Sequence, residues 1–222
     1  MVEIEGVKIE KVAVVDDEPN NREGYGLYVH DADMEPSDEA GPFPNLDDCL
    51  ADLSRRSDAI LSDYQLRARN YAVFHGAQLI AGAYRARKPS VLCTKYEYAE
   101  IVQIRPFRRW IPSLITPSEL NPETLVVAMR RCIQEFQGRF LQARRAHRAM
   151  IRIEGVDVGP AGWQVDVCVP TWNTGEIIRL TSADVPDPQI RAAMGFEKRL
   201  YAQVNLGAEQ QTELYFDEWT VT

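Results

Sequence analysis

Residues 11–22 read KVAVVDDEPNNR, and this stretch decides the fold class of the first half of the chain. Residues 11–15 are rich in β-branched side chains and stop at the acidic pair Asp16 and Asp17, which is typical of a short buried strand that ends at a charged sheet edge. Pro19 stands where a helix can begin. The stretch therefore predicts a strand, an acidic turn and a helix, in that order.

The same order recurs along the chain. The apolar run in DAILSD ends at Asp63, SVLC is followed by Thr94, and the run in IPSLI is followed by Thr116, with helical patterns between these runs. Alternating strands and helices predict an α/β domain with a doubly wound, five-stranded parallel sheet over residues 1–121. In such sheets the functional crevice lies beyond the carboxyl ends of the strands. The residues of interest are therefore Asp16, Asp17, Asp63, Thr94 and Thr116.

A long helix is predicted over residues 122–150, because apolar residues recur there at helical steps. The stripe consists of Leu125, Met129, Cys132, Phe136, Ala143, His147 and Met150. Two arrangements stay open: one helix packed along both domains, or a projecting helix that pairs two copies into a homodimer. Gly138 weakens either arrangement.

Residues 151–222 change to alternating polarity and frequent turns, which predicts a small antiparallel β-rich domain of about five strands with one short helix over residues 188–194. This part holds 5 Lys and Arg against 11 Asp and Glu. An anionic module of this kind is not expected to bind nucleic acid. We expect an output domain that acts by contact with a protein partner.

The composition points to a globular chain of 222 residues with a net charge of -8, which argues against broad attraction to nucleic acid or to an anionic membrane. Its four cysteines have no metal-site spacing and fit buried thiols in a reducing compartment. The acidic N-terminus is unlike a signal peptide, and no apolar run is long enough to span a membrane. The sequence predicts a cytoplasmic protein.

Three carboxylates at adjacent strand ends would repel one another unless a hard cation joined them, and Mg²⁺ prefers oxygen ligands. A divalent-cation site at Asp16, Asp17 and Asp63 is therefore expected.

Residues 11 to about 135 resemble the receiver (response-regulator, CheY-like) domain of two-component signalling. The resemblance lies in the segments VVDDEPNNR, ILSDYQL, GAQLI and VLCT. It implies a flavodoxin-like sheet, Mg²⁺ held by Asp16 and Asp17 with Asp63, and phosphorylation of Asp63 by a histidine kinase or another phosphodonor. It also implies that the hydroxyl of Thr94 hydrogen-bonds a phosphoryl oxygen.

Two positions depart from the family pattern. Family members carry a lysine after the fifth strand and an aromatic residue three positions earlier, and here Thr116 and Ser113 stand in those places. A threonine cannot supply the point charge of a lysine in a phosphate site. We expect Lys95 to contact the phosphoryl group instead, or one of the nearby arginines, which are Arg105, Arg108 and Arg109.

The sequence thus favours an atypical response regulator that is not an enzyme, with possible Mg²⁺-dependent phosphorylation of Asp63 and output through the C-terminal β domain. Two alternatives stay open. One is a phosphorylation-independent pseudo-receiver that serves as a scaffold or adaptor. The other is a Mg²⁺-dependent phosphohydrolase with Asp63 as its nucleophile.

Overall fold

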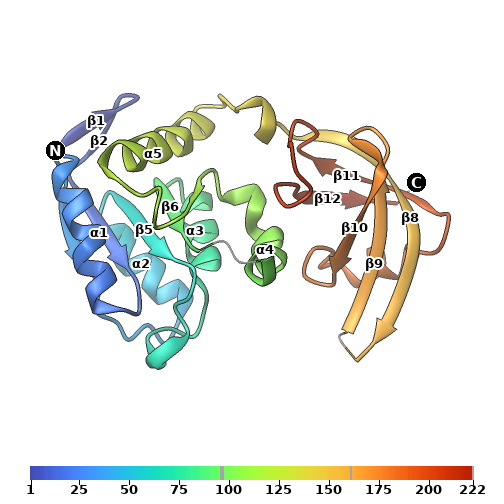
Figure 1. Cartoon of the computed structure of the whole chain (residues 1–222), viewed down its shortest axis with the longest axis horizontal. Helices are drawn as coiled ribbons and strands as arrows, with labels where there is room; N and C mark the ends of the chain where they lie inside the picture. The colour runs from blue at the N-terminus through green and yellow to red at the C-terminus, as the bar shows by residue number, and fades with distance from the viewer. Residues whose placement is uncertain (96–97, 161, 222) are drawn as a thin grey trace. The chain divides into compact units, whose positions relative to one another are not determined.

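The computed structural model describes residues 1–95, 98–160 and 162–221 of the chain. The chain divides into two compact units (Figure 1). Unit 1 comprises Met1–Tyr98 and Trp110–Phe140, and unit 2 comprises Ala99–Arg109 and Leu141–Thr222. The backbone therefore enters unit 2 once, returns to unit 1, and enters unit 2 again. Within the described part of the chain, no helix is long and apolar enough to cross a membrane.

Unit 1 is built on a parallel five-stranded sheet with the order β4-β3-β5-β6-β7. Its strands are β3 (Lys11–Val15), β4 (Glu35–Asp38), β5 (Ala59–Asp63), β6 (Ser90–Cys93) and β7 (Leu114–Ile115). In order of sequence this is the 2-1-3-4-5 arrangement of flavodoxin-like and CheY-like sheets. The predicted fold class is confirmed.

The sheet of unit 1 is flanked by the α-helices α1 (Pro19–Asp31), α2 (Leu46–Arg56), α3 (Gly76–Arg85) and α5 (Pro122–Phe136). Helix α1 packs against α5, and α2 packs against α3, so the sheet is covered by two helix pairs (Figure 1). Both α2 and α5 begin at an asparagine whose side chain accepts hydrogen bonds from the first turn. Buried strand side chains such as those of Val12 and Leu61 form the core under these helices.

Unit 1 also contains elements that the sequence did not reveal. A hairpin of β1 (Val2–Ile4) and β2 (Val7–Ile9) precedes the sheet. Strand β4 has the sequence EPSD, which contains no apolar run. It lies at the edge of the sheet, where its proline costs no ladder hydrogen bond. Between β6 and β7 the chain forms helix α4 (Tyr98–Ile104) and the 3₁₀ segment η2 (Arg105–Trp110), of which residues 99–109 belong to unit 2.

The long helix predicted over residues 122–150 is wrong in its second half. Helix α5 ends at Phe136, and Gly138 follows with a φ of 79°, a left-handed conformation that ends helices and favours glycine. After the short 3₁₀ segment η3 (Gln142–Arg144), the chain is already in strand β8 (His147–Gly159). The projecting helix on which the expected homodimer depended is therefore not formed.

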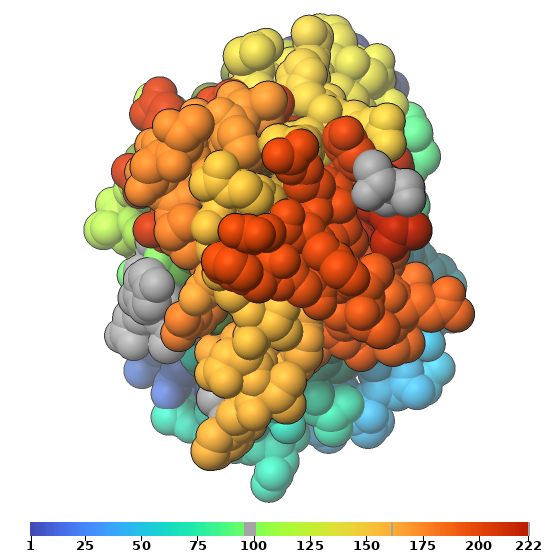
Figure 2. Space-filling model, turned by 90° about the vertical axis from the view of Figure 1, so that its right-hand side faces the viewer, coloured from blue at the N-terminus to red at the C-terminus, as the bar shows by residue number. Residues whose placement is uncertain are grey.

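Unit 2 contains an antiparallel five-stranded sheet with the order β10-β9-β8-β11-β12. With β8, its strands are β9 (Gly162–Val169), β10 (Asn173–Thr181), β11 (Arg199–Val204) and β12 (Phe216–Thr220). Helix α6 (Pro188–Ala193) is the short helix that the sequence predicted. The long hairpin of β8 and β9 is visible in Figure 1, and strand residues coloured yellow to orange lie on the face shown in Figure 2. The predicted antiparallel β-rich domain is confirmed.

Candidate functional site

The carboxyl ends of three neighbouring strands place the candidate site. The last residue of β3 pairs with the residue before Asp63 in β5, so Asp16 follows at the neighbouring position. Asp63 in turn pairs with the last residue of β6, and Thr94 follows directly. The strand register therefore brings Asp16, Asp63 and Thr94 to one edge of the sheet, as the sequence predicted.

Asp16 is almost completely buried, with an exposed fraction of 1%. Its Oδ1 accepts a hydrogen bond from the backbone N of Glu18 at 2.7 Å, and its Oδ2 accepts one from Nδ2 of Asn21 at 3.2 Å. Burial raises the pKa of Asp16 and the like charge of Asp17 adds to this effect, while the two hydrogen bonds and Arg22 oppose it. Burial therefore disfavours the ionised form of Asp16, and a bound cation would stabilise that form.

Asp63 is half-buried at the end of β5. Its Oδ2 accepts a hydrogen bond from the backbone N of Gln65 at 2.6 Å. Its carbonyl oxygen accepts a hydrogen bond from Ser62 Oγ at 2.8 Å and lies against Gly76, where a Cβ atom would come within 1.8 Å of it. Glycine at the first position of α3 therefore allows the helix to approach the end of β5 and fixes the strand end that carries Asp63.

A thiol and a phenol lie near both carboxylates. Sγ of Cys93 and Oη of Tyr25 are 3.8 Å apart, and both side chains are buried. Burial raises the pKa of Cys93 to about 12 and also raises that of Tyr25, and the charges of Asp16 and Asp63 add to both shifts. With pKa values raised in this way, the thiol and the phenol are protonated at neutral pH.

The end of the fifth strand carries a hydroxyl and a carboxylate in place of a cation. The backbone N and the Oγ1 of Thr116 each donate a hydrogen bond to Oε2 of Glu119 at 2.8 Å, and these bonds lower the pKa of Glu119. The charge of Glu119 also contributes to the raised pKa of Cys93. Ser113 is buried and donates to the carbonyl of Ala128 at 3.3 Å.

Lysine and arginine side chains that the sequence suggested in place of the family lysine lie in both units. Lys95 is exposed at the residue after Thr94. Arg105 is buried and its Nη1 donates to the carbonyl of Arg179 at 2.8 Å, within unit 2. Arg108 and Arg109 also belong to unit 2, where their carbonyls accept hydrogen bonds from another arginine side chain. All three arginines thus belong to unit 2, and the expectation that one of them contacts the phosphoryl group stays a prediction.

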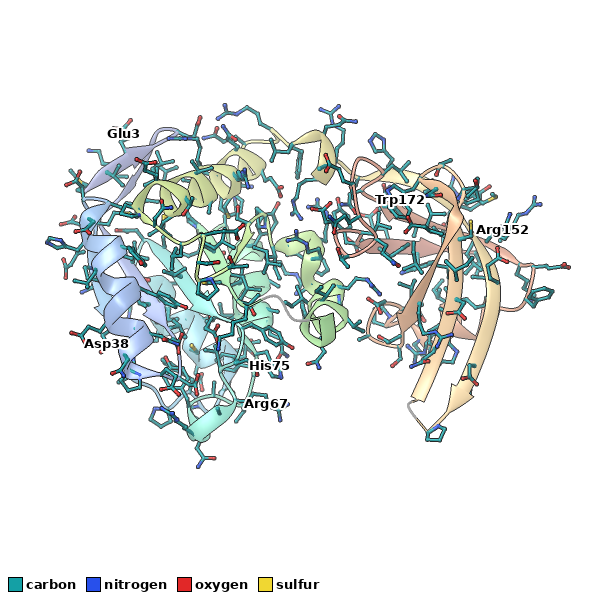
Figure 3. All side chains as sticks on the ribbon, in the orientation of Figure 1. Glu3, Asp38, Arg67, His75, Arg152 and Trp172 are labelled. Atoms are coloured by element: carbon teal, nitrogen blue, oxygen red, sulfur yellow. The ribbon has the colours of Figure 1, made fainter. Side chains whose placement is uncertain are left out.

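Two arginines near the site were missed. Arg22 of α1 is buried, pairs with Asp38 and donates from Nη1 to the carbonyl of Asp16 at 2.7 Å. Arg69 belongs to the 3₁₀ segment η1 (Ala68–Asn70) in the loop between β5 and α3, and its Nη1 donates to Oε2 of Glu18 at 2.7 Å. Arg67 and His75 of the same loop are labelled in Figure 3. These ion pairs depend on the folded chain, and neither has a signal in the sequence.

The donor atoms at this edge fit Mg²⁺ in kind. Mg²⁺ is commonly bound by one or two carboxylates together with water and phosphate oxygens, and Asp16 provides a buried carboxylate whose charge is not fully balanced. Among residues 1–95, 98–160 and 162–221, no group of three or more histidine, cysteine or acidic side chains is placed to hold a metal ion. Coordination by Asp16, Asp17 and Asp63 together stays a prediction.

Comparison with known proteins gives matches among solved structures only, since no family model and no curated protein matches the chain. A response regulator receiver domain protein from Clostridium thermocellum is similar at 10% identity, over 58% of this chain and 98% of that chain, with a TM-score of 0.44. The chemotaxis response regulator CheY4 of Vibrio cholerae is similar at 22% identity, over 56% and 99%, with a TM-score of 0.41.

A further similar structure is a CheY-like response regulator receiver domain protein from Methanospirillum hungatei, at 16% identity over 59% and 98% of the two chains, with a TM-score of 0.43. The fold itself is defined by the strand order and the parallel register of unit 1. The N-terminal part of the chain therefore has the doubly wound fold with the strand order that flavodoxin and CheY share.

Proposed function

We propose that the chain is a response regulator of the two-component type in which Asp63 accepts a phosphoryl group. The observation that carries the proposal is the placement of Asp16, Asp63 and Thr94 on one edge of a receiver-like sheet. Phosphoryl transfer needs an oxygen nucleophile, groups that balance the charge on the transferred oxygens, and little other chemistry from the protein. Asp63 would supply the oxygen nucleophile, and Asp16 and Thr94 would contribute to balancing the charge on the transferred oxygens.

The proposed step is a simple displacement. One carboxylate oxygen of Asp63 forms a bond to the phosphorus of the donor, and the bond from phosphorus to the donor's imidazole nitrogen breaks. The nitrogen keeps the electron pair and takes a proton from solvent, and Asp63 becomes an acyl phosphate. The backbone N of Gln65 holds Oδ2 of Asp63, and the hydroxyl of Thr94 would donate to a phosphoryl oxygen. A phosphorylated histidine kinase would serve as this donor. With acetyl phosphate as donor, the bond between phosphorus and the acetate oxygen breaks instead, and acetate leaves with the electron pair.

Mg²⁺, when bound, would neutralise charge that develops on the phosphoryl oxygens. Asp16 and Asp63 would hold it, with Asp17 close by in the sequence. The protein's own residues would keep the carboxylates in position at the strand ends. Asn21 and Glu18 orient Asp16, and the close approach of α3 fixes the end of β5.

Output through unit 2 is supported by the path of the chain. The segment that follows Thr94 contributes residues 99–109 to unit 2 before the chain returns to unit 1 at Trp110. Within unit 2 this segment is held by the hydrogen bond from Arg105 to Arg179 and by the Arg144 side chain. A displacement of Thr94 on phosphorylation would therefore be passed along the chain into the C-terminal domain, which would present the result to a protein partner.

A phosphorylation-independent scaffold is the second candidate, and one observation favours it. Thr116 and Glu119 occupy the end of the fifth strand, where the family has a lysine. In this case unit 1 would serve as a docking surface and the acidic edge would carry no phosphate.

Labelling with acetyl [³²P]phosphate and Mg²⁺ distinguishes the candidates. A response regulator takes up close to one phosphate per chain, the label is stable in acid and lost in alkali, and Asp63→Asn abolishes it. Asp48→Asn, which changes an exposed carboxylate of α2, is the matched control and should label like the unmodified protein. Absence of label would favour the scaffold, and continuous release of phosphate would indicate the phosphohydrolase.

A further inference from the structure

The ion pair between Arg69 and Glu18 links the two loops whose backbones hold the carboxylates of the candidate site. The backbone N of Glu18 donates a hydrogen bond to Oδ1 of Asp16. At the start of the loop that carries Arg69, the backbone N of Gln65 donates a hydrogen bond to Oδ2 of Asp63. Each partner of the ion pair is therefore within a few residues of a group that is hydrogen-bonded to a site carboxylate. The pair joins the chain segments that follow β3 and β5.

We propose that Arg69 supplies the positive charge that a phosphoryl group on Asp63 requires. In the unphosphorylated protein Arg69 pairs with Glu18, and after phosphorylation it pairs with the phosphoryl group. This inference rests on the proposed function. It assigns a phosphate-contacting residue where the expected lysine is replaced by Thr116.

The charges around the site favour Arg69 over Arg22. Arg22 is 7% exposed, and it is tied to Asp38 and to the carbonyl of Asp16. Moving it would leave a buried charge without its partner, which is costly. The side chains of Arg69 and Glu18 are 58% and 41% exposed, and an exposed ion pair contributes little to stability. A phosphoryl group, with more negative charge than one carboxylate and a geometry that suits guanidinium, can therefore take Arg69 from Glu18.

The loop holds Arg69 in a defined conformation. Arg69 and Asn70 both have left-handed backbone, with φ of 55° and 59°, which non-glycine residues adopt only where surrounding contacts maintain it. Those contacts come from Tyr71, whose hydroxyl donates to the carbonyl of Glu39 and whose own carbonyl accepts from the backbone N of Phe43 at 2.6 Å. These contacts keep the Arg69 backbone in place.

Binding of beryllium fluoride, a phosphoryl mimic that attaches to aspartate, tests the inference when it is followed by ¹⁹F NMR in the presence of Mg²⁺. We expect Arg69→Ala to weaken binding about tenfold or more, as the loss of a hydrogen bond to a charged group implies. Arg67→Ala removes the same charge from the same loop and should stay within about twofold of the unmodified protein. Glu18→Gln frees Arg69 and should strengthen binding.

The outcomes separate the two proposals. If the unmodified protein binds beryllium fluoride and Arg69→Ala binds it equally well, the role of Arg69 is overturned and the proposed function stands. Equal losses in Arg69→Ala and Arg67→Ala would indicate a general effect of positive charge and would also overturn the role of Arg69. If the unmodified protein binds no beryllium fluoride, the proposed function itself fails. Circular dichroism of each variant confirms that it is folded.

Discussion

Gly76 and Asp63 touch through their backbones: a Cβ atom on Gly76 would lie 1.8 Å from the carbonyl oxygen of Asp63 and 2.8 Å from its carbonyl carbon. The nearest atoms belong to the backbone, which cannot turn aside as a flexible side chain can. The first turn of α3 and the end of β5 are therefore packed so closely that only glycine fits, and the position of Asp63 depends on this contact.

Gly76→Ala should lower the free energy of unfolding by about 3 kcal/mol, at the upper end of the usual cost of overpacking. Phosphorylation of Asp63 should fall as well, because the strand end must shift. Chemical denaturation measures the first effect and acetyl phosphate labelling the second. Gly24→Ala is the control: Gly24 lies in α1, where an added Cβ atom would meet no other atom within 4 Å, and alanine there should be neutral or stabilising by up to about 1 kcal/mol. Equal effects of the two changes would contradict the packing argument.

Gly138 ends α5 with a φ of 79°, so Gly138→Ala should cost about 1 kcal/mol in the free energy of unfolding. Urea denaturation checks this value. Gly155→Ala is a suitable comparison, because Gly155 has neither a positive φ nor an atom near the place that a Cβ would take. A stabilised Gly138→Ala variant would instead support a helix that continues past Phe136.

The buried carboxyl group of Asp184 is expected to make the stability of unit 2 depend on pH. It is 3% exposed, its Oδ2 accepts hydrogen bonds from the backbone N and Oγ1 of Thr181, and Arg105 supplies an opposing charge. Burial raises the pKa of Asp184 above its ordinary value of 3.8, against the weaker effects of Thr181 and Arg105. Protonated Asp184 therefore favours the folded state. Its contribution is complete below the ordinary pKa and is lost as pH rises through the raised pKa.

Asp184→Asn removes this titration, so the wild-type protein should lose stability relative to Asp184→Asn as the pH rises from below 3.8 towards neutrality. Thermal unfolding of both proteins across this range provides the test. A relative gain in wild-type stability with rising pH would mean that Arg105 dominates and lowers the pKa of Asp184.

The Arg144 side chain holds the segment 99–109 within unit 2. Its Nη1 and Nη2 donate to the carbonyls of Arg108 and Arg109 at 2.8 and 2.9 Å. Arg144→Ala should therefore speed amide hydrogen exchange in residues 101–109, while β6 keeps its protection. Exchange followed by mass spectrometry measures this, and Arg145→Ala, at an exposed neighbouring position, is the control. Unchanged exchange in Arg144→Ala would contradict the anchoring of this segment.

The sequence predicts what depends on local pattern. Strands β3, β5 and β6 are continuous apolar runs, and the polar residue that follows each run is a direct guide to the site. Strand β4 was missed because EPSD has no apolar run, and it is formed by pairing with β3 at the sheet edge. Strand β8 overlaps the end of the predicted helix over residues 122–150, where apolar residues fit helical spacing. In the strand, burial alternates at Ala149, Ile151 and Ile153. The two periods compete there, and Gly138 decides between them.

The remaining parts of the site depend on contacts between distant residues. The pairing of Arg69 with Glu18 and the burial of Arg105 in unit 2 leave no trace in composition or spacing, since an exposed loop arginine and a buried one look alike in sequence. For the same reason the sequence shows that Thr116 stands where the family has a lysine, but it does not indicate Arg69.

Reduction of the phosphorylated protein with sodium borohydride, followed by peptide mapping, identifies the residue that carries the phosphoryl group. An acyl phosphate on Asp63 is reduced to an alcohol, so the peptide from this strand should contain homoserine at position 63 after treatment with acetyl phosphate and Mg²⁺. Homoserine at another aspartate position, or none at any position, would contradict the assignment of Asp63 as the phosphoryl acceptor.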